Sequence, residues 1–212
     1  MKTGENSRFF CIFSVIKKYF VMTEEIKVSN LAKYRRYLEN LIGEEKTSLL
    51  FDVLGGEEAV MNASFGMTLD SGSAYEGAFV KNSLEIADYA SKLNKLLPEE
   101  LQVTNASIYK VALLHHIGKI LMYEKNANDW EVKNRGIIYK FKDEDKNALR
   151  CGEVSLYYLN QVGVQFTLDE FEAMRVIDKV NAGDDSIRWY GSILSTLIRQ
   201  ANETVSLINQ KV

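Results

Sequence analysis

The only two histidines of the chain, His115 and His116, are adjacent and are the residues best suited to chemistry. An imidazole can bind a metal ion or exchange a proton near neutral pH. The pair lies in an apolar stretch, where an imidazole is costly to bury without a hydrogen-bond partner. A purely structural interpretation is therefore also open, in which one ring packs in the core against a backbone partner and the other faces a cavity.

The string from Ala112 to Lys119 resembles the L-L-H-D-I-G-K motif of the HD (His-Asp) metal-dependent phosphohydrolase superfamily, with His116 in place of the aspartate. Four further segments resemble motifs of the same family in the same order, at 77–87, 151–155, 171–175 and 197–202. The resemblance covers about Tyr75 to Ser206, and ordered matches are harder to obtain by chance than one short motif. It implies an all-α, HD-domain-like helical bundle.

Carried over position by position, the resemblance implies a degenerate metal site. Asparagines replace the first metal-binding histidine and the last aspartate, His116 replaces the paired aspartate, and a cysteine and an isoleucine replace additional histidines. Only His115 is unchanged. In chain order the six positions are Asn82, His115, His116, Cys151, Ile177 and Asn202.

These replacements should weaken the binding of a hard cation. Mg²⁺ and Mn²⁺ prefer carboxylate oxygens, whereas Asn82 and Asn202 carry neutral carboxamides. Adjacent side chains of a helix also point about 100° apart, so the two imidazoles cannot easily chelate one ion together. We therefore expect no resident metal. The alternatives are a Zn²⁺ site made by the two histidines with Cys151, or ligands that have moved to the aspartates in the polar segment 178–185.

Three cations could meet a phosphate near the same site, namely Lys119, Arg150 and Arg175. Such side chains are more often simply solvated, which is the alternative here. The sequence has no phosphate-binding glycine loop, no G-x-S-x-G elbow and no H-E-x-x-H pair. No other catalytic motif competes with the histidine pair.

Apolar residues recur at three- and four-residue spacing through most of the chain, which predicts the helices that would position these residues. Ser107 to Met122 is the most apolar segment and is predicted to form one continuous central helix. Alternation around an Asn-Arg-Gly turn predicts a β-hairpin from Trp130 to Phe141, and Thr167 with Glu170 forms a capping box that starts a late helix. The other predicted helices span 27–43, 46–54, 57–63, 78–97, 154–162, 167–177 and 187–208.

Length and composition set the remaining limits. A chain of 212 residues with 46% apolar and 26% charged residues is long enough for one sizeable core. The net charge of −3 gives no drive toward nucleic acid. Two cysteines far apart in sequence, Cys11 and Cys151, favour reduced thiols in a cytoplasmic protein.

The division of the chain that we expect is an N-terminal extension at 1–21, a helical segment at 22–74 and an HD-like domain at 75–212. The apolar run in the extension is too short to span a bilayer, and its lysines follow the run, unlike those of a secretory signal. We expect translation to begin at Met22 and the extension not to be native. An amphipathic tail or partner helix is the alternative.

Three functions follow as hypotheses. The first is a non-catalytic HD-like protein that binds a nucleotide or phosphorylated small molecule, or a protein partner. The second is a metal-dependent phosphohydrolase with a reorganised site, and the third is a structural protein that assembles into homo-oligomers.

Overall fold

The amphipathic segments expected from the sequence form helices in the computed structural model, which describes residues 22–142, 149–176 and 191–211. The described part confirms an all-α fold class with one small two-stranded sheet. The long helices are α2 (Glu24–Ile42), α3 (Glu44–Val53), α5 (Ala78–Asn94), α6 (Asn105–Leu114), α9 (Cys151–Gln161), α10 (Leu168–Val176) and α11 (Ile193–Lys211). Shorter elements are α4 (Glu57–Asn62), α7 (Gly118–Met122), α8 (Asp129–Arg135), the 3-10 turns η1 (Leu69–Ser71) and η2 (Glu99–Leu101), and the strands β1 (Tyr123–Lys125) and β2 (Tyr139–Phe141).

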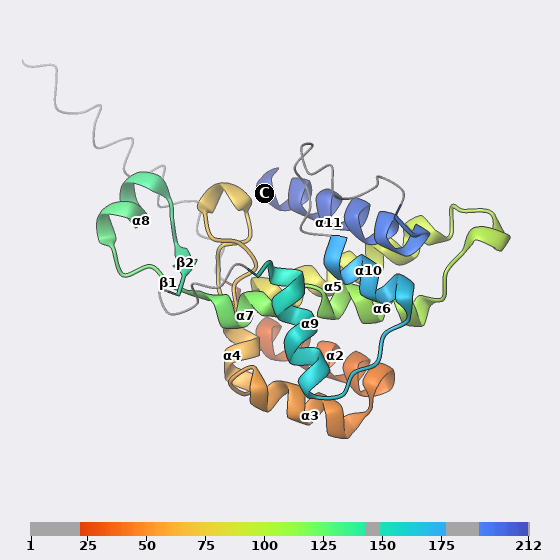
Figure 1. The fold of residues 1–212 in the computed structure, drawn as a ribbon. Coiled ribbons are helices and arrows are strands. Elements are labelled where there is room, and N and C mark those ends of the chain that lie inside the picture. The colour runs from red at the N-terminus through yellow and green to blue at the C-terminus, as the bar shows by residue number, and fades with distance from the viewer. Residues whose placement is uncertain (1–21, 143–148, 177–190, 212) are drawn as a thin grey trace, which may run out of the picture.

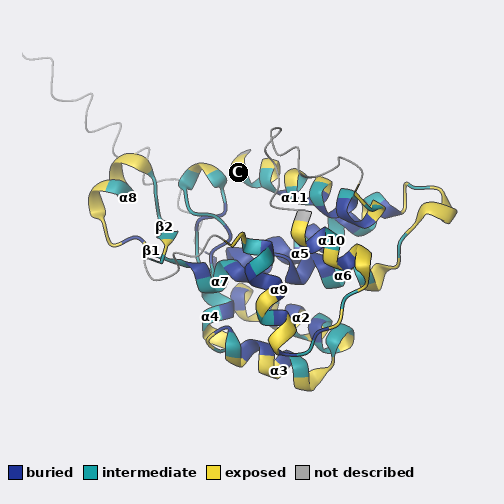
Figure 2. Ribbon diagram, in the orientation of Figure 1, coloured by how far each residue is buried: buried dark blue, intermediate teal, exposed yellow. Residues whose placement is uncertain are grey.

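Helices α5 and α6 pack along each other in the middle of the molecule (Figure 1). Helices α10 and α11 lie on one side of this pair, and α2, α3 and α4 lie on the other (Figure 1). Buried residues concentrate on the central helices and on the inward faces of their neighbours (Figure 2). Within the described residues, no helix is both long and apolar enough to cross a membrane.

The segment 22–74 shares its core with the rest of the chain. Tyr34 of α2 is fully buried, its hydroxyl donates to the backbone oxygen of Leu113 at 2.8 Å, and its ring packs edge-on against Phe79 of α5. One cluster of buried apolar residues runs from Leu31 on α2 to Val205 on α11. Burial of this apolar surface is the main force that holds the helices together.

The apolar stretch from Ser107 to Met122 does not form one helix, so that prediction was wrong. Helix α6 ends at Leu114, residues 115–117 form a turn, and α7 begins at Gly118. Apolar periodicity could not show this break, because the turn is as deeply buried as the helices on either side of it. The break falls at the histidine pair.

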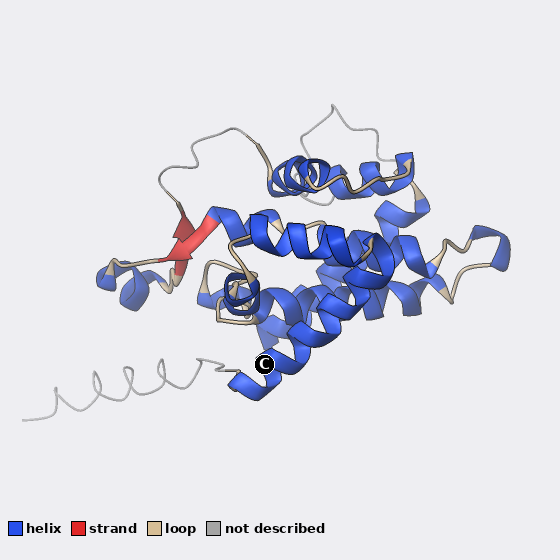
Figure 3. Ribbon diagram, turned by 90° about the horizontal axis from the view of Figure 1, so that it is seen from below, coloured by secondary structure: helices blue, strands red, loops and turns tan. Residues whose placement is uncertain are grey.

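The predicted hairpin was wrong in its first strand. Trp130 to Val132 belong to helix α8, whose first turn is capped by the side-chain oxygen of Asn128 and whose last turn ends at Gly136 in the left-handed conformation. The Asn-Arg-Gly sequence is therefore a helix end and not a hairpin turn. The second strand is confirmed as β2, and it lies beside β1 (Figure 3). The two strands pair antiparallel, with Tyr123 opposite Phe141.

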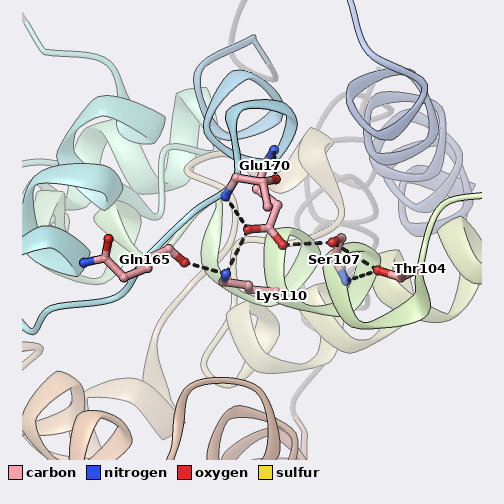
Figure 4. Close-up of polar contacts among 6 residues, drawn as sticks. Thr104, Ser107, Lys110, Gln165 and Glu170 are labelled. Atoms are coloured by element: carbon pink, nitrogen blue, oxygen red, sulfur yellow. Dashed lines mark hydrogen bonds and ion pairs between the residues drawn. The ribbon is translucent and has the colours of Figure 1, made fainter.

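The capping box at the start of α10 is confirmed. The backbone N–H of Thr167 donates to the carboxylate of Glu170 at 2.9 Å, and the backbone N–H of Glu170 donates to the Thr167 hydroxyl at 3.2 Å. The same carboxylate accepts hydrogen bonds from the Ser107 hydroxyl and the Lys110 ammonium of α6 (Figure 4). A local start signal thus also fastens α10 to the central helix.

Candidate functional site

The two histidine rings lie against each other in the turn between α6 and α7. His115 is fully buried and His116 is 4% exposed, and their ring centroids are 3.8 Å apart at an interplanar angle of 39°. The expected divergence of about 100° applies to a continuous helix, which this turn interrupts. The pair is therefore a single buried unit.

The Nδ1 atom of His115 lies 3.1 Å from the backbone oxygen of Val111 and 2.8 Å from that of Ala112. Because carbonyl oxygens only accept, Nδ1 must carry a proton, and in the neutral ring the lone pair is on Nε2. This contact confirms the backbone partner expected of a core histidine. It is also the way in which metal-binding histidines are commonly oriented.

Phe65, which the sequence analysis missed, joins His116 to Lys119. Its ring centroid lies 5.1 Å from that of His116, in an edge-to-face arrangement. The Lys119 ammonium lies 3.7 Å from the centroid of the same ring and donates to the Phe65 backbone oxygen at 3.0 Å. Phe65 lies in the irregular segment between α4 and α5, and no sequence pattern pointed to it.

Ser155 of α9 fastens the histidine turn to the bundle. Its fully buried hydroxyl accepts from the backbone N–H of Gly118 at 2.9 Å and lies 3.0 Å from the backbone oxygen of His115. Gly118 makes this close approach possible, because a Cβ atom there would lie 2.7 Å from the backbone oxygen of Cys151. The fold therefore places Cys151 beside the histidines, with its thiol 3.8 Å from the His116 backbone oxygen.

The two asparagines of the predicted site lie on α5 and α11, which pack together. Asn82 is fully buried, and its side-chain oxygen accepts from the Asn209 carboxamide of α11 at 2.6 Å. Asn202 lies two helical turns before Asn209, so both are on the same side of α11. Asn209 was missed, although its seven-residue distance from Asn202 was visible in the sequence.

The two predicted arginines lie on the surface. Arg150 is exposed at the start of α9, where its backbone N–H donates to the Glu153 carboxylate at 3.1 Å. Arg175 of α10 is 47% exposed and forms an ion pair with the same carboxylate at 3.6 Å. Lys119 is connected to the histidine pair through Phe65, whose ring contacts both Lys119 and His116.

The described residues do not assemble a set of metal ligands. Among them, no group of three or more histidine, cysteine, aspartate or glutamate side chains is placed to hold a metal ion. The other predicted ligand positions, Ile177 and the aspartates at 178, 184 and 185, lie outside the described residues. The Zn²⁺ trio of the histidines and Cys151 stays a prediction.

No protein-family model, no curated protein and no solved structure matches this chain. The resemblance to the HD superfamily therefore stays a prediction based on the motifs themselves.

Proposed function

We propose that this chain is a non-catalytic relative of the HD phosphohydrolases that keeps the helical scaffold and binds a nucleotide or phosphorylated ligand at the former metal centre. The observation that carries the proposal is the deep burial of Asn82, His115 and His116, at three positions where the resemblance expects metal ligands. Burying a polar side chain is costly unless it is hydrogen-bonded, so three such side chains in the interior need an explanation. None of the three carries the negative charge that Mg²⁺ or Mn²⁺ needs.

Lys119 supports a phosphorylated ligand. Its ammonium lies over the Phe65 ring, which in turn contacts His116, so a positive charge is held beside the histidine pair. An ammonium is a common partner for phosphate oxygens. The contact with the Phe65 ring and backbone oxygen also limits the conformations of this long side chain.

The test is titration calorimetry of the full chain against a panel of nucleoside mono-, di- and triphosphates, with a chelator present. We expect saturable binding that weakens about tenfold or more in Lys119→Gln, because a charge-assisted hydrogen bond is lost. Lys133→Gln is the matched control, since Lys133 is 74% exposed on α8. No binding across the panel would refute the nucleotide proposal and favour a protein partner.

A metal-dependent phosphohydrolase is the second candidate, favoured by the hydrogen bonds that orient His115. Its test is the divalent-metal content of the purified protein. Near-stoichiometric metal that is lost in His115→Ala, together with metal-dependent hydrolysis of a nucleotide or phosphodiester, would establish this candidate against the first.

Assembly into homo-oligomers is the third candidate. Large apolar side chains are exposed on separate elements, including Trp130 on α8 (62%), Tyr157 on α9 (55%) and Leu168 on α10 (81%). Exposed apolar side chains mark an interface where they form one contiguous patch, whereas single ones are ordinary on a protein surface. Light scattering of the full chain across a range of concentrations would show the oligomeric state, and a monomer throughout would exclude this candidate.

A further inference from the structure

We infer that a relay of three side chains, Lys81, Asn209 and Asn82, makes Asn82 offer a hydrogen-bond donor at the position where the resemblance expects a metal ligand. The Asn82 position would then be suited to an oxygen acceptor of a ligand and unsuited to a divalent cation. The orientation of the Asn82 carboxamide follows from the hydrogen bonds of Asn82 and Asn209 and does not depend on the proposed function. That the ligand is phosphorylated rests on the proposed function.

The direction of the relay follows from the chemistry of its first member. The Lys81 ammonium can only donate, so the Asn209 atom that it meets at 3.2 Å must be the side-chain oxygen. The nitrogen of Asn209 then faces Asn82, at 2.6 Å from its side-chain oxygen. The acceptor of Asn82 is thereby occupied, and its NH₂ group is on the other side of the carboxamide.

That NH₂ group is buried and has no hydrogen-bond partner within the described residues. The hydroxyl of Ser83 and the side-chain oxygen of Asn202 are also buried without a hydrogen-bond partner within the described residues. Buried polar atoms nearly always have partners, so a missing partner indicates a site where a ligand or water supplies one. A metal ion cannot be the partner of Asn82, because a cation needs a lone pair and Asn82 offers N–H bonds there.

Contacts on α5 and α11 fix the positions of Lys81 and Asn209, the two residues that orient Asn82. Lys81 also pairs with Glu85 one turn later on α5 at 2.8 Å, which keeps its ammonium at the surface of the α5–α11 interface. The turn at η1 packs directly on the end of α11, because Gly72 has no side chain. A Cβ atom there would lie 2.0 Å from the Asn209 backbone oxygen. Asn209 is thus held against α5 and not left on a fraying helix end.

The experiment measures Mn²⁺ binding to the full chain, by electron paramagnetic resonance of the free ion, in the wild type and in two variants that reverse the polarity. Asn82→Asp keeps an acceptor for Asn209 and presents a second carboxylate oxygen. Asn209→Ala leaves Asn82 free to turn its own oxygen inward. We expect Mn²⁺ affinity to rise about tenfold or more in Asn82→Asp, since a hard cation gains an anionic ligand, and to rise less in Asn209→Ala.

Asn94→Asp is the matched control, because Asn94 is a buried asparagine of α5 that bonds the backbone of Val103. It adds the same charge to the same helix and should leave Mn²⁺ affinity unchanged. If Asn82→Asp does not fold, Asn209→Ala carries the test. Wild-type Mn²⁺ binding as tight as in Asn82→Asp, or no gain in either folded variant, would overturn the inference.

A second arm measures inorganic phosphate by calorimetry, and we expect wild-type binding to weaken about tenfold or more in Asn82→Asp through charge repulsion. Phosphate binding that is absent, or that is equal in the wild type and Asn82→Asp, would overturn the acceptor assignment. The proposed function is judged separately by the nucleotide panel and Lys119→Gln. Nucleotide binding that depends on Lys119 but not on Asn82 would leave it standing.

Discussion

Glu170→Gln should destabilise the protein more than any exposed substitution, and it should do so in a pH-dependent way. Glu170 is 4% exposed and accepts from the Lys110 ammonium, the Ser107 hydroxyl and the Thr167 backbone N–H at 2.8 to 2.9 Å (Figure 4). A glutamine has nearly the same shape and keeps one acceptor oxygen. The substitution therefore removes the negative charge beside Lys110 with little change in packing.

The magnitude follows from the burial of both partners. The side chains of Lys110 and Glu170 are 16% and 5% exposed, and removing one partner of a buried ion pair typically costs about 3–5 kcal/mol. Lys110 also donates to the Gln165 backbone oxygen at 2.5 Å and lies over the Phe166 ring. These contacts remain in the variant, so we expect a loss at the lower end of this range. The free energy of unfolding at pH 7 should fall by about 3 kcal/mol.

The pH dependence has a defined sign. Burial acts to raise the pKa of Glu170, but hydrogen bonds from Lys110, Thr167 and Ser107 outweigh it and hold the pKa below its ordinary value. The unfolded chain therefore takes up this proton at a higher pH than the folded chain does. Stability from Glu170 is present above the unfolded pKa of about 4.3 and is lost as the pH falls through the lower, folded pKa.

Urea unfolding of the wild type and Glu170→Gln at pH 7 and at several acidic pH values measures both effects. The difference between the two proteins should shrink as the pH falls below about 4.3. Glu203→Gln, at an exposed position of α11, should change stability by less than about 0.5 kcal/mol. If Glu170→Gln lowers the free energy of unfolding by less than about 1 kcal/mol at pH 7, the ion pair behaves like an exposed one and the reasoning is refuted. A loss of stability that does not change with pH would also refute it.

Three further substitutions test other contacts. Tyr34→Phe should lower the free energy of unfolding by about 1 kcal/mol at pH 7. Because burial raises the pKa of Tyr34, the variant should lose less stability than the wild type above pH ~10. Equal alkaline losses of the two proteins in urea unfolding would contradict this. Ser155→Ala should lower the free energy of unfolding by about 2 kcal/mol, because the Gly118 N–H loses its buried acceptor. It should also shift the imidazole NMR signals of His115, and an unchanged imidazole spectrum would show that Ser155 does not position the ring. Gly118→Ala should cost about 3 kcal/mol or more by clashing with Cys151, and calorimetric melting close to the wild-type temperature would disprove the close approach.

The helices were largely predictable because the signals that form them are local. Leu31, Tyr34 and Leu38 recur at helical spacing, and all three are buried on α2. The capping box at Thr167 also depends on residues three positions apart. The predictions were wrong where one local sequence pattern is compatible with two different structures. The Asn-Arg-Gly string suits a hairpin turn as well as a helix end, and the buried residues 115–117 suit a turn as well as a helix.

The motifs named the residues of the candidate site, but they gave no information about the contacts between those residues. The motifs located Asn82, His115, His116 and Cys151, and the structure places these residues in the interior or against its edge. The contacts that define their chemistry come from other residues, which lie on other elements of the fold. Phe65 approaches His116 from an irregular segment, and Ser155 reaches the turn from 40 positions away along the chain.

Apart from α8 and the break at 115–117, the sequence alone therefore determined which segments are helical and which of their faces are buried, since both depend on residues three or four positions apart. Tertiary structure alone decided the stacking of the two histidine rings, the pairing of β1 with β2 and the direction in which the Asn82 carboxamide points. The last depends on Asn209, which is 127 positions away. Contacts over such distances arise only when the apolar faces of the helices pack together, and a one-dimensional pattern does not specify which polar atoms that packing brings within hydrogen-bond distance.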